Sequence, residues 1–93
     1  MGKFRVEIEE LARIHIEKHL TSGDKASIKK LQKILHQLTE HPFIGVGNPE
    51  PLKYQLTGKW SREINKKDRI IYKVNEEIVT VFVISAMGHY TDK

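Results

Sequence analysis

Six polar residues in the second half of the sequence have side chains that could cleave a phosphodiester bond. They are a carboxylate, a histidine, a tyrosine and three cations: Glu50, Lys53, Arg62, Arg69, His89 and Tyr90. RNA can be cut without a metal if a base takes the ribose 2′-hydroxyl proton, an acid protonates the departing 5′-oxygen and cations stabilise the phosphoryl oxygens. An RNA-cleaving site is therefore one hypothesis for these residues.

The same residues also have ordinary structural interpretations. Glu50 lies between two prolines, where a solvated loop carboxylate is common, and Arg69 follows a turn, where a surface arginine is common. His89 and Tyr90 lie within five residues of the end of the sequence, and such residues are usually loosely ordered unless something docks them. The residue types alone leave both interpretations open.

The sequence contains no cysteine, no metal-ligand spacing and no glycine-rich nucleotide-binding loop. We therefore predict that the protein uses no metal and no cofactor. The absence of cysteine is compatible with the reducing cytoplasm. The opening residues "MGKFRVEIEE" lack the apolar stretch of a signal peptide, and no run of about 18 apolar residues offers a membrane span, so a cytoplasmic protein without membrane contact is expected.

Positive charge is concentrated in one segment. Residues 53–73 hold seven basic side chains against two acidic ones, a local charge of +5, whereas the whole chain carries +4. Such a segment can attract a polyanion such as RNA or DNA. A solvated lysine-rich surface is an equally good interpretation of the charge alone.

The first half of the chain has helical periodicity. Ile28, Leu31, Leu35 and Leu38 recur at spacings of three and four within residues 24–39, which predicts a helix with one apolar stripe. Asp24 or Ser22 can cap this helix. The segment "EELARIHIEKHL" also suits a helix, so a helical hairpin is expected, with a short strand at "KFRVEI" before it.

The second half begins with a loop and continues with short strands. "HPFIGVGNPEP" has three prolines and two glycines in eleven residues, which excludes regular structure. "LKYQL", "WSREI", "RIIYKV" and "IVTVFVI" are rich in β-branched and aromatic residues and are separated by turn sequences. We predict one α+β domain over residues 1–93, with two N-terminal helices on one face of an antiparallel sheet and Trp60 partly buried.

Several motifs occur together in an informative order. The string "PFIGVGNPEPLKYQLTGKWSREINKKDRIIYKV", followed after one more strand by "GHY", resembles the YoeB/Txe branch of the RelE-type toxins of bacterial toxin–antitoxin pairs. The resemblance covers residues 42–90 in register, and the helical half is similar only in pattern. Many members of that family have a second basic residue after "WSR", where this chain has Glu63.

The resemblance implies a small ribosome-dependent endoribonuclease that cuts mRNA in the decoding site. It implies that Glu50 is the general base, that His89 is the general acid and that Arg69 stabilises the phosphate. Lys53 and Arg62 would bind substrate phosphate and Tyr90 would stack on a base. The basic side chains expected to contact the ribosome are Lys59, Lys66 and Lys67. A free histidine has a pKa of about 6.5, and substrate phosphate nearby would raise the protonated fraction of His89.

The resemblance also implies partners. We expect a cognate YefM/Axe-like antitoxin whose acidic segment wraps this protein, the ribosome with its mRNA, and operator DNA only through the antitoxin complex; a homodimer is compatible with the family. The alternative is a non-catalytic ParE-like toxin that binds a target such as DNA gyrase. The presence of Glu50, Arg69 and His89 together favours the nuclease, because a pure binding protein needs no proton-transfer groups.

Overall fold

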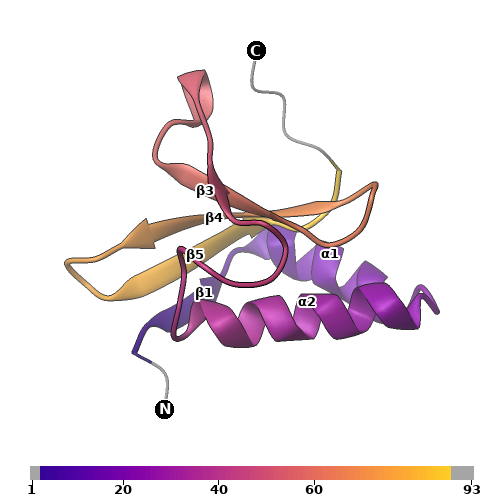
Figure 1. Cartoon of the computed structure of the whole chain (residues 1–93). Helices are drawn as coiled ribbons and strands as arrows, with labels where there is room; N and C mark the ends of the chain where they lie inside the picture. Colours follow the sequence, from indigo (N-terminus) through magenta and orange to yellow (C-terminus); the bar gives the residue numbers. More distant parts are fainter. Residues whose placement is uncertain (1–2, 89–93) are drawn as a thin grey trace.

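The protein consists of a sheet with two helices packed on one of its faces, as seen in a computed structural model that describes residues 3–88 (Figure 1). The helices are α1 (Glu10–Leu20) and α2 (Lys25–Leu38). The strands and one short 3-10 turn are β1 (Arg5–Ile8), β2 (Glu50–Pro51), η1 (Tyr54–Leu56), β3 (Lys59–Glu63), β4 (Arg69–Asn75) and β5 (Thr80–Ser85). The predicted α+β class with two helices on one face of the sheet is confirmed.

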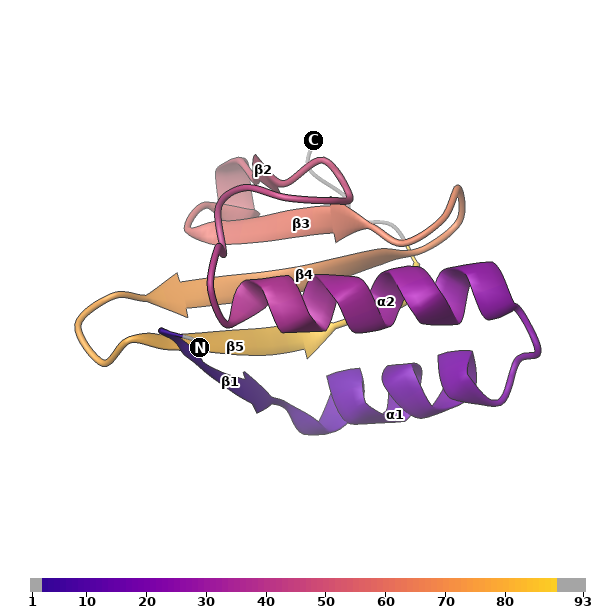
Figure 2. The same cartoon turned by 60° about the horizontal axis from the view of Figure 1, so that its bottom comes forward.

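The sheet is mixed rather than purely antiparallel. Its strand order is β1-β5-β4-β3-β2. The last four strands pair antiparallel as the short connections predict, whereas β1 pairs parallel to β5. The expected N-terminal strand is therefore present, and its parallel pairing is possible because α1 and α2 separate it in the chain from its partner. Figure 2 shows β1 beside β5 at one edge of the sheet.

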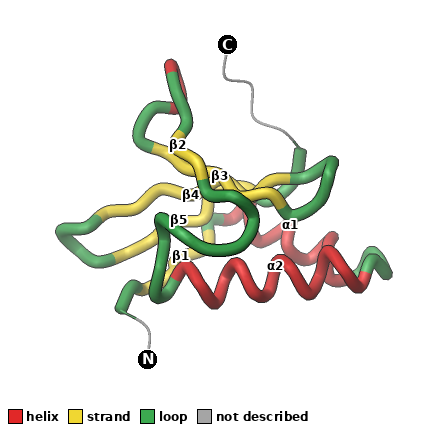
Figure 3. The backbone as a smooth tube through the Cα atoms, viewed as in Figure 1, coloured by secondary structure: helices red, strands yellow, loops and turns green. Residues whose placement is uncertain are grey.

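One predicted strand is wrong. Residues 52–56 do not form a strand, because β2 ends at Pro51 and Tyr54 adopts a positive φ of 58°. Leu52 still donates its N–H to the Lys59 carbonyl at 2.9 Å, and then Leu56 donates to Lys53 at 3.0 Å to form the turn of η1. The chain therefore reverses between β2 and β3 instead of extending the sheet, as the secondary-structure colouring in Figure 3 makes clear.

Helix α2 supplies much of the core. Asp24 caps it, accepting from the backbone N–H of Ser27 at 3.1 Å and from the Ser27 hydroxyl at 2.7 Å. These hydrogen bonds lower the pKa of Asp24 below its ordinary value of 3.8. Leu31 and Leu38 of the predicted stripe are fully buried, together with Ile34, which the predicted stripe omits. The buried face of α2 is therefore rotated slightly about the helix axis from the predicted stripe.

The core lies between the helices and the covered face of the sheet. Its sheet side consists of alternate residues of β4 and β5 and the residue that follows β3: Ile70, Tyr72, Val81, Val83 and Ile64. Trp60 is half-buried, as predicted, and its ring lies 5.0 Å from that of Phe43, centroid to centroid. Within residues 3–88, neither helix is long and apolar enough to cross a bilayer.

Candidate active site

Strand pairing brings Glu50 and Arg69 to the face of the sheet that the helices leave open. Glu50 pairs with Ser61, and Ser61 pairs with Ile71. Directly paired residues have side chains on the same face, and so do residues two apart on one strand, so Arg69 shares that face. Ile70 and Tyr72, which alternate with them, point into the core. Figure 1 shows both helices on the opposite side.

Ser61 pairs with Glu50 through the backbone and contacts Arg69 through its side chain. Arg69 donates from Nη1 to the Ser61 hydroxyl oxygen at 3.4 Å, across the β3–β4 pairing. Ser61 is fully buried, while Glu50 and Arg69 are half-buried. Ser61 belongs to no chemical motif in the sequence, although its position two residues before Glu63, which pairs with Arg69, makes the contact predictable once the register is known. The result is a carboxylate and a guanidinium on one face with a hydroxyl between them.

Gly88, which follows β5, also lies beside Arg69. The backbone N–H of Arg69 donates to the Gly88 carbonyl at 3.0 Å, and the Gly88 N–H donates to Oδ1 of Asp68 at 2.9 Å. Asp68 is buried and Gly88 is exposed, so the second bond is partly protected from water. His89 and Tyr90 lie outside the described residues, and their predicted roles remain predictions. Gly88, which precedes them directly, is nevertheless fixed beside Arg69.

Arg62 lies in the interior and is not available to a ligand. Its side chain has no exposed surface. The guanidinium donates to five groups: the Tyr72 hydroxyl at 3.1 Å, Gln37 Oε1 at 2.9 Å and the carbonyls of Val46, Ile44 and His41. A cation whose donors are all used inside the protein cannot bind substrate phosphate. The prediction of a phosphate-binding Arg62 is therefore replaced by a structural role.

Arg62 instead organises the loop that delivers Glu50. Three of its acceptors are loop carbonyls, and the Tyr72 hydroxyl beside it donates to the Pro42 carbonyl at 2.7 Å. Burial raises the pKa of Tyr72 above its ordinary value of 10.0, although Arg62 opposes the effect, so the hydroxyl keeps its proton. The loop therefore follows a fixed path, visible in Figure 3 as the irregular segment between α2 and β2.

The glycines of "GVG" have packing roles. A Cβ on Gly45 would lie 2.1 Å from Gln37 Oε1, and a Cβ on Gly47 would lie 2.9 Å from the Glu63 carbonyl. Gly47 also has a φ of +84°, and its carbonyl accepts from the Glu63 N–H at 2.7 Å. Only glycine lets the loop approach Arg62 and the edge of β3 this closely.

The three lysines predicted to dock the ribosome, together with Lys53, which is predicted to bind substrate phosphate, fall into two groups. Lys53 and Lys59 flank η1, whereas Lys66 and Lys67 are exposed in the turn between β3 and β4. β3 runs from Lys59 to Glu63, so the two groups lie at opposite ends of this strand. Lys66 and Lys67 immediately precede Asp68 and Arg69, and they are therefore the lysines nearest in sequence to Arg69.

The chain matches one protein family over most of its length. Residues 15–90 match the family described as YoeB-like toxin of bacterial type II toxin-antitoxin system. Toxin YoeB of Synechocystis is 37% identical over 68 residues, which is 73% of this chain and 77% of that protein. The matched region includes Glu50, Ser61 and Arg69.

Solved structures agree with the sequence match. A YoeB/ParE toxin from Agrobacterium tumefaciens superposes with a TM-score of 0.82 at 28% identity, covering 94% of this chain and all of the other. A YoeB dimer from Staphylococcus aureus has a TM-score of 0.78 at 29% identity, covering 96% of this chain and all of the other. A YoeB-YefM complex from the same organism has a TM-score of 0.75 at 28% identity, with the same coverage.

Proposed function

This chain belongs to the family of YoeB-like toxins of bacterial type II toxin–antitoxin systems, and we propose that it is a ribosome-dependent endoribonuclease that cleaves mRNA. The observation that supports the proposal most directly is the placement of Glu50 and Arg69 on the open face of the sheet, on either side of Ser61. A base and a phosphate-binding cation on one exposed face suit phosphodiester cleavage. A ParE-like binding protein would have no use for this pair.

The proposed reaction is an internal transesterification. Glu50 takes the proton of a ribose 2′-hydroxyl, and the 2′-oxygen attacks the adjacent phosphorus as the bond from phosphorus to the 5′-oxygen breaks. His89 gives a proton to the departing 5′-oxygen. The products are a 2′,3′-cyclic phosphate and a free 5′-hydroxyl, so no water is consumed in this step.

In the proposed reaction, Arg69 stabilises the charge of the transition state. Negative charge grows on the phosphoryl oxygens in the transition state, and a guanidinium held in place stabilises it without reorganisation. The hydrogen bond to Ser61 holds Arg69 on the open face. Lys53 adds a second cation from the exposed start of η1, and Tyr90 stacks on a base next to the cut.

The experiment that tests this function is end mapping in a translating extract. Purified protein should create new mRNA 5′-ends inside the coding region, with a free 5′-hydroxyl, and only when ribosomes carry the message. The same mRNA without ribosomes should stay largely intact, because phosphate contacts alone do not orient a 2′-hydroxyl for in-line attack. Inhibited translation with full-length mRNA would reject the nuclease in favour of another toxin mechanism.

Ribosome docking is proposed to depend on the β3–β4 turn. Reversing Lys66 and Lys67 to glutamate should weaken ribosome sedimentation binding most at low salt, and the difference from the parent should shrink as salt rises, because each lost phosphate contact removes about one unit from the salt slope. The same charge change at Lys3 and Lys29, also exposed, is the control. Equal ribosome binding by both double variants at all salt concentrations would indicate that the turn is an ordinary solvated surface with no special role in docking. Lys59→Glu, at the other end of β3, should reduce binding separately.

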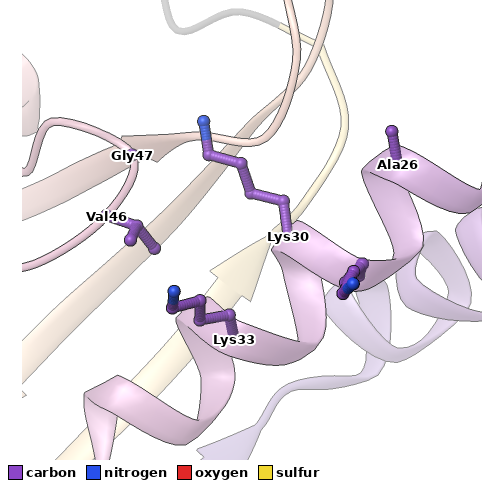
Figure 4. Close-up of a pocket in the computed structure, with 6 residues that line it drawn as sticks. Ala26, Lys30, Lys33, Val46 and Gly47 are labelled. Carbon is purple, nitrogen blue, oxygen red and sulfur yellow. The ribbon is translucent and has the colours of Figure 1, made fainter.

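An acidic segment of a YefM/Axe-like antitoxin is the proposed partner, and α2 offers it a basic groove. A groove of about 580 Å³ lies between α2 and the loop before β2, lined by Ala26, Lys29, Lys30, Lys33, Val46 and Gly47. Figure 4 shows Lys30 and Lys33 extending from the helix toward Val46 and Gly47. Residues 25–39 contain four lysines and no acidic residue. Lysines around an apolar floor suit an acidic peptide with apolar side chains.

The groove makes a prediction about antitoxin binding. Changing Lys30 and Lys33 to glutamate should slow antitoxin association by about tenfold or more at low salt, because complementary charge chiefly raises the association rate. Stopped-flow or surface-binding kinetics with the purified antitoxin measure this rate. Cleavage in the translating extract should remain, which separates the groove from the active site. An unchanged association rate would indicate that the antitoxin binds a different surface of the protein.

A further inference from the structure

Two histidines of α1 hold the backbone of the residue that follows β5. The Ala86 N–H donates to Nδ1 of His15 at 3.0 Å, and the Ala86 carbonyl lies 2.7 Å from Nε2 of His19. His15 and His19 are four residues apart, so they lie on the same face of the helix. Ala86 is fully buried and His19 nearly so, and both polar groups of Ala86 are thereby satisfied away from water.

The protonation states follow from the partners. A carbonyl only accepts, so His19 must carry its proton on Nε2, and it does so in one neutral tautomer and in the charged form. A backbone N–H only donates, so Nδ1 of His15 must be unprotonated, which requires the neutral ring. The His15 bond therefore exists only while His15 is neutral, whereas the His19 bond tolerates a charge.

The histidine pair is the first of two anchors on the strand end. Ala86 is held against α1, and two residues later Gly88 is held by Asp68 and the backbone of Arg69. Only Met87 lies between them, so the path of the chain from the helix layer to the candidate site is fixed at both ends. Residue 89 follows Gly88 directly in the sequence.

We propose that His15 and His19 are positioning residues that hold the Ala86–Gly88 segment in place beside Arg69, and that protonation of His15 releases this segment. The proposal rests on the proposed function for its catalytic consequence, because the segment leads directly to His89, the proposed general acid. The two histidines have opposite requirements. His89 must be protonated to act as an acid, and His15 must be neutral to hold the segment.

The surroundings of His15 favour the neutral form. Burial lowers its pKa below the ordinary 6.5, and the charges of Lys18 and His19 on the same helix act in the same direction, while Asp68 across from it opposes them. Because the folded protein binds this proton less readily than the unfolded chain, the contribution to stability is complete above about pH 6.5. It is lost as the pH falls from there through the lowered pKa of His15. A pH interval is left in which an ordinary histidine is partly protonated and His15 is still neutral.

Amide hydrogen exchange tests the anchoring without any RNA. In the parent protein the protection of the Ala86 amide, taken relative to the intrinsic rate at each pH, should fall roughly tenfold as His15 becomes protonated, in line with the loss of one hydrogen bond. In His15→Asn the side-chain oxygen replaces Nδ1 and does not titrate, so protection should not change with pH. His36→Asn, at an exposed histidine of α2, should behave like the parent. Protection that is independent of pH in the parent would overturn the proposal.

The pH profile of cleavage tests the catalytic consequence. The parent should lose activity on the acid side with the pKa of His15, measured independently by NMR, and His15→Asn should remove that loss. His15→Phe, which has no acceptor, should reduce cleavage at least tenfold at pH values where His15 of the parent is neutral, at a temperature where the variant is folded, while ribosome sedimentation stays near the parent. An acid limb unchanged in His15→Asn would refute the link to catalysis. If no variant cleaved mRNA, the proposed function would fail, whereas the exchange data would still decide the anchoring.

Discussion

Replacing Glu50 by glutamine is expected to lower ribosome-dependent mRNA cleavage by about 10²- to 10⁴-fold, the usual contribution of a positioned proton-transfer group. Glutamine has nearly the same shape but cannot take a proton from a 2′-hydroxyl. The pairing of residue 50 with Ser61 uses the backbone, so the fold should be kept. Single-turnover cleavage on programmed ribosomes measures the effect, and a melting curve verifies the fold.

Glu63→Gln is the matched control for this prediction. Glu63 is half-buried on the same open face, pairs directly with Arg69 in the sheet and makes the same change of charge when it is replaced. Cleavage by Glu63→Gln should stay within a fewfold of the parent. If both variants lost activity equally, negative charge near Arg69 would matter rather than a base at residue 50. If Glu50→Gln cleaved normally, Glu50 would not be the base.

Much of the fold follows from local patterns. The spacing of Leu31 and Leu38 marks α2, β-branched and aromatic runs mark β4 and β5, and the aromatic Trp60 marks β3, because these elements bury one face each. The parallel pairing of β1 with β5 has no such local sign, since it joins residues that are about 75 positions apart in the chain. The chain reversal at η1 could not be predicted from Tyr54, because an aromatic residue is common in strands and uncommon at positive φ.

The candidate site was only partly predictable for a similar reason. Alternation along β3 and β4 is enough to place Ser61 and Arg69 on one face once the pairing register is known. The same alternation puts Arg62 on the face of Trp60, so a partly buried Trp60 already argues for a covered Arg62. Charge alone suggests the opposite, because arginine is usually exposed. His15 could not be assigned from sequence, since its partner Ala86 is 71 residues away.

Replacing Arg62 by leucine is expected to destabilise the fold by about 3 kcal/mol or more, because removing one member of a buried polar network leaves its partners buried without hydrogen bonds. Gln37 Oε1 and the carbonyls of His41 and Ile44 would lose a charged donor. In a chain of this size such a loss corresponds to a fall of roughly 12–24 °C in melting temperature. Urea unfolding followed by tryptophan fluorescence measures it, with Lys67→Leu as the exposed control.

Arg62→Lys should lie between the parent and Arg62→Leu. Lysine keeps the charge, but it has a single ammonium in place of the planar fork that reaches acceptors from both α2 and the loop before β2. Because that loop delivers Glu50 to the sheet, loosening it should also lower cleavage at temperatures where the variant is still folded. A stability change below about 0.5 kcal/mol for Arg62→Leu, the range of ordinary surface substitutions, would contradict the structural role of Arg62. It would show that the buried hydrogen bonds of Arg62 to α2 and to the loop before β2 do not hold the fold together.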